Sequence, residues 1–328
     1  MTDLIFHIGL PKCGSTTLQR EIFSEIPGYL GTSTKDLDRN FAKEFQKVTP
    51  TGARLKGNLK RAQLWADEVS KTLEKKFPDV SRYIVSDEFL SQWNKKQYRP
   101  IIPFLKDFNE NVWTRGQVKV LIILRNQPEK LASSYAQRSI SLFGASQKDF
   151  QKYIKNINTT RIKYLDYSIW INDLYKTFGQ ENVCVLFLEE MNSEKFWKDL
   201  NNFMQLGYNH NELLIKANTR ANVRSKEVDK WDLRPLDITY KSKEIPKKML
   251  DFLWPTYKAP NLRSNVFSTL QKGNELFYTL HPGRIKEKQR EDQIVLTNEL
   301  RDQILEKFKS SNDRLSVLLG KDLKSLGY

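Results

Sequence analysis

Near its start the chain reads Leu4-Ile5-Phe6-His7-Ile8-Gly9-Leu10-Pro11-Lys12-Cys13-Gly14-Ser15-Thr16-Thr17-Leu18. The first five residues are largely apolar, which predicts a short buried strand. A turn bracketed by glycine and proline follows, and residues 15–17 open an amphipathic run that carries Leu18, Ile22 and Phe23. The stretch therefore predicts a strand, a tight loop and a helix. Backbone N–H groups at such a helix N-terminus favour a phosphate or sulfate, so we expect a terminal oxyanion as the ligand.

The loop is similar to the nucleotide P-loop G-x-x-x-x-G-K-[ST], but it departs from that pattern at the lysine. Gly9 and Gly14 are five residues apart, and Thr16 stands where the hydroxyl belongs. Ser15 occupies the lysine position, and Lys12 lies before the second glycine. The lysine that would reach the β- and γ-phosphates of ATP is displaced, which weakens the interpretation as a magnesium-dependent kinase or ATPase. A strand, turn and helix without a ligand remains an alternative for this stretch.

The same residues resemble the 5′-phosphosulfate loop of the sulfotransferases, a family that uses 3′-phosphoadenosine 5′-phosphosulfate (PAPS). The resemblance implies that Lys12 neutralises the charge that develops on the departing phosphate, so that no metal is needed. It also implies that the 5′-phosphosulfate is bound by the loop and the first helical turn, at Lys12, Cys13, Gly14, Ser15, Thr16 and Thr17.

A second strand-to-helix junction lies at residues 118–142. Residues 118–124 form an apolar run that predicts a buried strand, and Pro128 is suited to begin a helix over 129–142. Residues 124–135 resemble the 3′-phosphate motif of the sulfotransferases, which implies that Arg125 and Ser133 bind the 3′-phosphate of the nucleotide. A guanidinium can grip a phosphate through two hydrogen bonds, and a helix hydroxyl adds a third. Taken alone, a salt bridge at Arg125 and a solvated Ser133 would be favoured, but two family motifs in the right order favour the nucleotide site.

A candidate base follows a third predicted strand, at residues 82–90. The strand ends in Ser86, Asp87 and Glu88, and the carboxyl ends of strands in an open α/β sheet are where ligands bind. In the glycan-modifying branch of the sulfotransferases a glutamate just past such a strand is the general base, and Glu88 matches it more closely than Asp87. Asp87 remains the alternative base or a helix cap. The small-molecule branch uses a histidine, but none of the chain's three histidines follows a strand in the right place.

The remaining pattern predicts the fold. A helix over 160–178, a buried strand over 183–188 and a helix over 194–204 continue the alternation of strand and helix that makes a parallel sheet. We expect a P-loop-like α/β fold, with a central parallel sheet flanked by helices, and a single sulfotransferase domain over 1–328. Its nucleotide-binding core is expected at 1–210. A loop-rich and helical extension at 211–328 ends in a long helix over 297–319.

A polar, basic segment at residues 218–225 follows the last clear strand. Family members carry a basic or asparagine-containing loop here that closes over the nucleotide or the acceptor, and the resemblance assigns this role to Arg220, Asn222 and Arg224. An exposed basic loop without that role is an equal alternative.

Composition narrows the partners and the compartment. The formal net charge of +15 favours anions such as a nucleotide or an acidic glycan, and it permits peripheral contact with a membrane surface. The basic residues are interleaved with acidic ones and form no stripe, which argues against nucleic-acid binding. No apolar run approaches the length of a membrane span. Two cysteines exclude a disulfide framework and a four-cysteine zinc site, which fits a cytoplasmic location without a signal peptide.

Together these observations predict a PAPS-dependent sulfotransferase that modifies a hydroxyl group of an acceptor and releases adenosine 3′,5′-bisphosphate. We expect the acceptor to be a glycan or glycolipid. The rival interpretations are a small-molecule kinase that uses ATP and magnesium, and a non-enzymatic binder of anionic polymers that would use the net charge of +15.

Overall fold

The computed structural model describes two compact units of the chain. The first comprises Met1–Gln127, Asn158–Lys226 and Leu305–Tyr328, and the second comprises Pro128–Ile157 and Glu227–Ile304. Within them the structure describes residues 2–30, 71, 75, 79–87, 102, 105, 106, 109, 110, 113, 115–142, 144–157, 165–219, 229–236 and 290–328. The expected single domain, divided at residue 210, stays a prediction.

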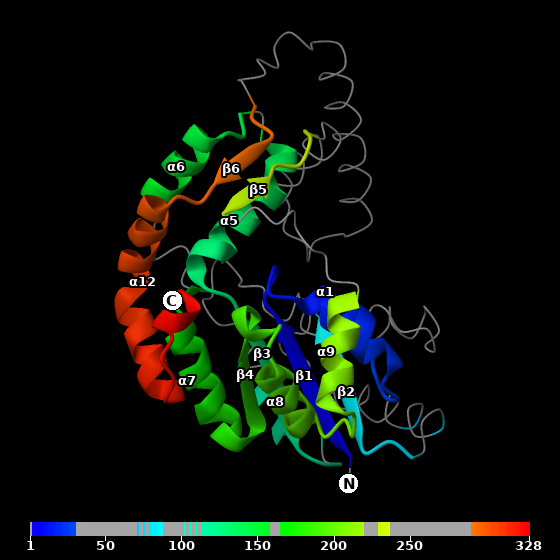
Figure 1. Ribbon diagram of the computed structural model, residues 1–328. Helices are drawn as coiled ribbons and strands as arrows, with labels where there is room; N and C mark the ends of the chain where they lie inside the picture. Colours follow the sequence, from blue (N-terminus) through cyan, green and yellow to red (C-terminus); the bar gives the residue numbers. More distant parts are fainter. Residues whose placement is uncertain are drawn as a thin grey trace, which may run out of the picture. The chain divides into compact units, whose positions relative to one another are not determined.

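A parallel sheet of four strands forms the centre of the first unit (Figure 1). The strands lie in the order β2-β1-β3-β4, and every neighbouring pair is parallel. Their bounds are Asp3–Gly9 for β1, Arg82–Asp87 for β2, Val118–Leu124 for β3 and Val183–Phe187 for β4. This sheet, flanked by helices, confirms the predicted α/β fold.

The two central strands, β1 and β3, are covered on both faces, which is why their sequences are largely apolar. Residues 4–9 of β1 and residues 120–124 of β3 are all buried. Ile8 pairs with Asp87 on one side and with Ile122 on the other, so the carboxyl ends of β1, β2 and β3 lie level. The chain leaves β1 for β2 on one side and leaves β3 for β4 on the other. In α/β sheets, such a reversal in the direction of strand addition leaves a crevice between the ends of the two strands concerned, here β1 and β3. Ligands bind at this place in α/β sheets.

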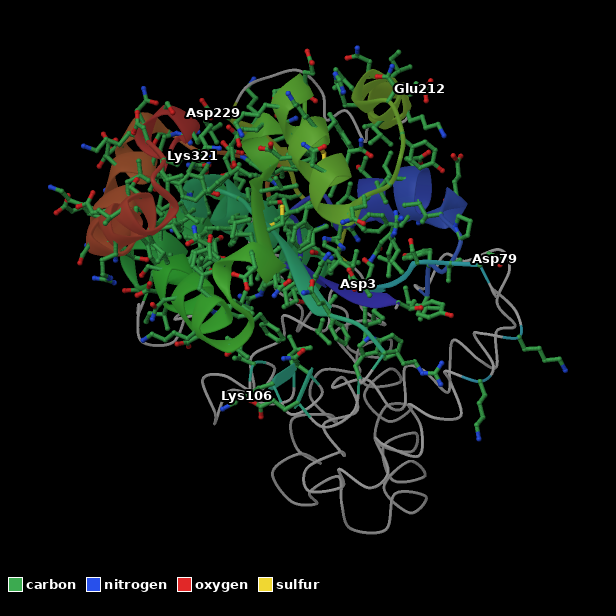
Figure 2. The ribbon with its side chains drawn as sticks, turned by 90° about the horizontal axis from the view of Figure 1, so that it is seen from below. Asp3, Asp79, Lys106, Glu212, Asp229 and Lys321 are labelled. Carbon is green, nitrogen blue, oxygen red and sulfur yellow. The ribbon has the colours of Figure 1, made fainter. Side chains whose placement is uncertain are left out.

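Helices cover both faces of this sheet. In Figures 1 and 2, α7 lies on one side, whereas α8, α9 and the helical segment after β1 lie on the other. That segment is irregular, since a short α-helical turn passes into a π-helical turn and then a 3-10 turn. The bounds are Ser15–Thr17 for α1, Leu18–Ile22 for η1, Phe23–Glu25 for η2, Tyr167–Phe178 for α7, Gln180–Asn182 for η6, Leu188–Glu190 for η7, Glu194–Met204 for α8, His210–Thr219 for α9 and Lys324–Leu326 for η9.

The second unit contains an antiparallel pair of short strands, β5 (Lys230–Asp232) and β6 (Gln293–Val295). Two arginines connect its parts. Arg301 lies 2.6 Å from a carboxylate oxygen of Asp229 and 3.0 Å from one of Glu129. Arg290 donates to the carbonyl groups of Ser139, Leu142 and Arg234. Among the described residues of this unit, η4 (Ser139–Ser141) and α6 (Gln147–Lys155) are helical, and two longer helices, α5 (Gln127–Arg138) and α12 (Asn298–Leu319), have residues in both units.

The predicted elements agree with the structure where the apolar runs are long. The strands predicted at 118–124 and 183–188 and the helix predicted at 194–204 are found within one residue of their expected bounds. Of the helix expected over 160–178, α7 begins at Tyr167, because Asp166 has a non-helical backbone and its side chain accepts a hydrogen bond from the Ile169 amide; residues 160–164 lie outside the described residues. The helix expected over 129–142 begins at Gln127 and ends at Arg138, followed by the turn η4. No helix in the described ranges has an apolar stretch long enough for a bilayer.

Candidate functional site

The β1 loop, residues 10–14, folds tightly through two left-handed residues. The Cys13 amide donates to the Leu10 carbonyl at 3.2 Å, and the φ angles of Lys12 and Gly14 are +70° and +81°. A Cβ atom on Gly14 would lie 2.8 Å from Cδ1 of Leu188 and 2.9 Å from Cε of Met191. The second glycine of the motif is therefore favoured by its left-handed conformation, and a larger residue would also displace the ends of the Leu188 and Met191 side chains.

The helix that begins at Ser15 leaves polar groups for a ligand at its first turn. The first hydrogen bond of this helical turn runs from the Thr17 amide to the Gly14 carbonyl, at 3.0 Å. The amides of Ser15 and Thr16 come before it in the sequence, at the N-terminal end of the turn, where helix amides have no partner within the helix. The Ser15 hydroxyl is 2% exposed and has no hydrogen-bond partner among the described residues. A buried hydroxyl without a partner is costly, so this atom favours an added acceptor such as a phosphate oxygen. Thr16 and Thr17 are partly exposed.

Arg125 brings the second motif to this loop. It follows the last residue of β3, is partly exposed, and its Nη1 donates to the Lys12 carbonyl at 3.2 Å. Both residues belong to the first unit. The two motifs, more than a hundred positions apart in the sequence, therefore meet at the crevice between β1 and β3.

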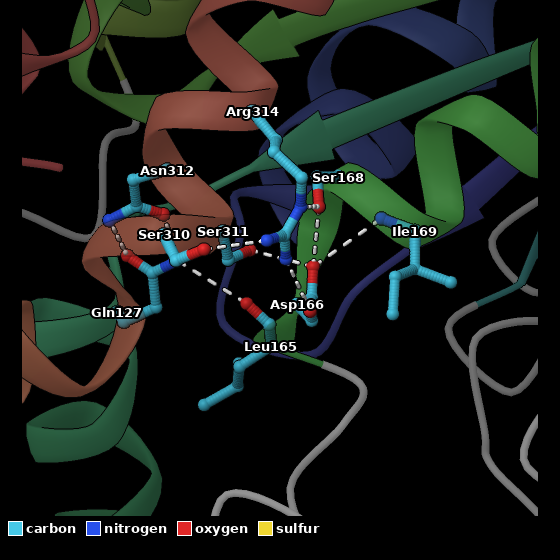
Figure 3. A network of polar contacts seen from close by, with 9 residues as sticks. All are labelled: Gln127, Leu165, Asp166, Ser168, Ile169, Ser310, Ser311, Asn312 and Arg314. Atoms are coloured by element: carbon cyan, nitrogen blue, oxygen red, sulfur yellow. Dashed lines mark hydrogen bonds and ion pairs between the residues drawn. The ribbon is translucent and has the colours of Figure 1, made fainter.

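The chain after Arg125 is held by buried polar side chains. The Nε2 of Gln127, which is fully buried, donates to Oδ1 of Asn312 at 2.7 Å and to the Leu165 carbonyl at 3.3 Å. Asn312 returns a hydrogen bond to Oε1 of Gln127 at 3.2 Å. Beside this pair, Asp166 accepts from Ser311 at 2.7 Å (Figure 3). The network joins α12 to the starts of α5 and α7, and it fixes the path of the chain as it leaves β3.

Figure 3 also shows how Asp166 begins α7. Its Oδ1 accepts from the hydroxyl of Ser168 at 2.6 Å and from the Ile169 amide at 3.4 Å. Its Oδ2 lies 3.2 Å from Nη2 of Arg314, which also contacts the Ser168 hydroxyl through Nε. Asp166 is thus a helix cap whose charge is paired with an arginine of α12.

The other predicted site residues fall in several places. Ser133 is buried on the second turn of α5 and belongs to the second unit, whereas Arg125 belongs to the first. Asp87 ends β2 and pairs with Ile8. The predicted base and the predicted basic loop lie outside the described residues, at Glu88, Arg220, Asn222 and Arg224.

His7 lies inside β1, and its burial makes it poorly suited to act as a base. Its ring is fully buried, with Nδ1 2.7 Å from the Ser86 hydroxyl, which also accepts from Nε2 of Gln19 at 2.9 Å. Burial lowers the pKa of His7 from 6.5 to about 3, because the apolar surroundings disfavour the charged ring. The ring therefore stays neutral at ordinary pH. In the described part of the chain, no group of three or more His, Cys, Asp or Glu side chains is arranged to hold a metal ion.

Sequence reasoning missed two residues that contact the backbone next to Arg125. The Tyr167 hydroxyl donates to the Arg125 carbonyl at 2.8 Å, and Oε1 of Glu189 accepts from the Asn126 amide at 2.9 Å. Glu189 lies two residues after β4, so the rule that strand ends carry functional side chains could have indicated it. The sequence gives no such indication for Tyr167, because its position is that of an apolar residue in an amphipathic helix.

Comparison with known proteins identifies the family of this chain. The sulfotransferase domain family matches residues 2–231. The chain belongs to that family. The predicted enzyme class, a PAPS-dependent sulfotransferase, is thereby confirmed, and the enzyme transfers a sulfuryl group to a hydroxylated acceptor. No curated protein matches the sequence.

Solved structures similar to this sulfotransferase are remote in sequence. A sulfotransferase from Alicyclobacillus acidocaldarius is 14% identical over 99% of this chain and 98% of its own, with a TM-score of 0.45. Mouse sulfotransferase SULT7A1, complexed with PAP, is 16% identical over 69% of this chain and 68% of its own, with a TM-score of 0.38. The sulfotransferase domain from the curacin biosynthetic pathway is 12% identical over 66% of this chain and 78% of its own, with a TM-score of 0.37.

Proposed function

We propose that the crevice between β1 and β3 binds PAPS and that the sulfuryl group passes from it, in line, to a hydroxyl of a glycan or glycolipid. The observation that carries the proposal is the hydrogen bond from Arg125 to the Lys12 carbonyl, 3.2 Å long. It joins the loop proposed for the 5′-phosphosulfate to the residue proposed for the 3′-phosphate. A nucleotide with phosphates at both positions needs two such sites side by side.

The 5′-phosphosulfate is assigned to the β1 loop and the turn after it. The amides of Ser15 and Thr16 and the buried hydroxyl of Ser15 supply donors, and the helix N-terminus supplies partial positive charge. Cys13, Gly14 and Thr17 complete the loop around the phosphate. Lys12 is assigned to the bridging oxygen, where its ammonium group would neutralise the charge that develops on the departing phosphate.

The 3′-phosphate is assigned to Arg125 and Ser133. A guanidinium matches a phosphate with two parallel hydrogen bonds, and a hydroxyl on the following helix adds one more. Arg220 and Arg224 are proposed to close over the nucleotide. Because ATP carries no 3′-phosphate, these residues would select PAPS over ATP.

Glu88 is assigned as the general base, with Asp87 as the alternative. Glu88 follows β2, whose last residue pairs with Ile8 of β1 just before the loop. As the acceptor oxygen forms its bond to sulfur, Glu88 takes the hydroxyl proton, and the bond from sulfur to the bridging oxygen breaks. Adenosine 3′,5′-bisphosphate leaves with the electron pair of that bond, stabilised by Lys12.

The acceptor class is proposed from the base and the charge. A glutamate base resembles the glycan-modifying branch of the family, and the net charge of +15 favours an acidic glycan or a glycolipid at a membrane surface. The two cysteines favour the cytoplasm as the compartment.

Calorimetric titration tests the proposal. Adenosine 3′,5′-bisphosphate should bind without magnesium, and Lys12→Ala should abolish transfer from PAPS while the bisphosphate still binds. Failure of the bisphosphate to bind, or transfer that survives in Lys12→Ala, would overturn the assignment of this site. A screen of hydroxylated acceptors that follows release of the bisphosphate would then identify the substrate.

A further inference from the structure

The peptide group between Arg125 and Asn126 is held at both of its ends by side chains. Its carbonyl accepts from the Tyr167 hydroxyl at 2.8 Å, and its N–H donates to Oε1 of Glu189 at 2.9 Å. Tyr167 is the first residue of α7, and Glu189 lies in η7, the turn after β4. Because a trans peptide points its carbonyl and its N–H in opposite directions, the two side chains grip it from opposite sides.

This peptide group lies where the sheet no longer supports the backbone. The last residue pair between β3 and β4 is Leu124 with Phe187, one position before Arg125. Buried backbone polar groups need partners, and here side chains supply them in place of a neighbouring strand. Tyr167 is fully buried and Asn126 is 4% exposed, so water does not compete effectively for these bonds.

The two side chains are themselves fixed by their surroundings. Oε1 of Glu189 also accepts from Nδ2 of Asn126 at 3.0 Å, and the same Nδ2 donates to the Leu326 carbonyl at 3.3 Å. The ring of Tyr167 packs against that of Tyr328, with centroids 6.3 Å apart, and Tyr328 packs edge-on to Phe187 at 5.5 Å. Such packing holds a positioning side chain in one rotamer.

We propose that Tyr167 and Glu189 are positioning residues for the nucleotide: by gripping this peptide group they fix the backbone of Arg125 and aim its guanidinium along the β1 loop. The inference rests on the proposed role of Arg125 at the 3′-phosphate. Neither side chain is assigned a contact with the nucleotide, so their loss should act only through Arg125. The contacts at the 5′ end come from the loop after β1, which the Arg125 guanidinium contacts at the Lys12 carbonyl, so the loss should fall mainly on the 3′-phosphate.

The test compares two ligands that differ only in the 3′-phosphate. Adenosine 3′,5′-bisphosphate and adenosine 5′-monophosphate are titrated into the full chain. Tyr167→Phe keeps the ring and removes the hydroxyl, and we expect it to weaken the bisphosphate about 3- to 10-fold, as for one lost hydrogen bond. The monophosphate should bind within a factor of about two of the unaltered enzyme.

Three further variants separate positioning from simple loss of structure. Tyr175→Phe removes a hydroxyl from the same helix, away from Arg125, and should change neither affinity. Glu189→Leu should weaken the bisphosphate selectively, as Tyr167→Phe does. Glu189→Gln retains an oxygen that can accept from the Asn126 amide, so it should restore most of the affinity that Glu189→Leu loses.

Arg125→Ala distinguishes failure of this inference from failure of the proposed function. If the unaltered enzyme binds both ligands equally, the 3′-phosphate assignment itself is wrong. If Arg125→Ala abolishes the preference for the bisphosphate but Tyr167→Phe and Glu189→Leu preserve it in full, the positioning role is wrong. Equal weakening of both ligands by Tyr167→Phe, together with a lower melting temperature, would show that the hydroxyl only supports the fold and would also overturn the inference.

Discussion

Acidification should destabilise this enzyme through His7. The ring is fully buried between β1 and the helical segment after it, and burial lowers its pKa from 6.5 to about 3. The folded protein therefore binds fewer protons at this site than the unfolded chain does. Acid consequently favours unfolding, with a loss of stability that begins as the pH falls through 6.5 and is complete near pH 3.

The size of the effect at pH 5 depends mainly on the unfolded chain. At that pH the unfolded ring is almost fully protonated, whereas the folded ring, with a pKa of about 3, is still neutral. Linkage then gives a loss of about 2 kcal/mol between pH 7 and pH 5. The folded pKa contributes little to this figure, because pH 5 lies well above it.

Urea unfolding at pH 7 and pH 5 measures the loss, with His7→Gln as the control that cannot gain the charge. The carboxylates titrate in both proteins, so the difference between the two pH dependences isolates His7. We expect the unaltered enzyme to lose about 2 kcal/mol more than His7→Gln over this interval. Parallel pH dependences in the two proteins would refute the reasoning, since His7 would then titrate alike in the folded and unfolded states.

The site makes four further predictions. Lys12→Met should lower kcat by about 100-fold or more and change the bisphosphate affinity much less, because the lysine acts on charge that develops in the transition state. Steady-state kinetics measures kcat, and calorimetry measures the affinity. Glu88→Gln should abolish turnover and leave the bisphosphate affinity nearly unchanged, and retained activity would remove Glu88 from the role of base. Arg125→Ala should weaken the bisphosphate by about 2 to 4 kcal/mol; a comparison with the monophosphate checks whether the loss is confined to the 3′-phosphate. Gly14→Ala should cost about 1 to 2 kcal/mol of stability for its left-handed backbone alone, and urea unfolding that matches the unaltered enzyme would contradict that requirement.

The sheet and its loops could be predicted because their signals are local. The strand at 118–124 is apolar except for Lys119, and the strand at 183–187 is apolar throughout, a composition typical of a parallel sheet covered by helices. The tight turn at Gly14 follows from a glycine before a run of hydroxyl residues. Chain order also located the candidate site residues at strand ends. Their roles stay predictions, and Glu88 lies outside the described residues.

The features that escaped prediction depend on contacts between distant residues. The pairing of β5 with β6 joins segments about sixty positions apart, each only three residues long. Helix α9 begins at His210, at the expected boundary between the nucleotide-binding core and the C-terminal extension. Helix α8 and the helical segment after β1 pack against it. The π-helical turn at Leu18–Ile22 has the composition of an ordinary helix. Tertiary packing overrides local preference in such elements.

Slow product release is the expected result of the contact between Arg125 and the Lys12 carbonyl. Adenosine 3′,5′-bisphosphate keeps both phosphates after the sulfuryl group has gone, so it can retain every proposed contact at either end of the nucleotide. A site built around two linked phosphates therefore binds its spent donor about as firmly as the fresh one. Departure of the bisphosphate, rather than sulfuryl transfer, should then limit turnover, and the bisphosphate should inhibit in competition with PAPS.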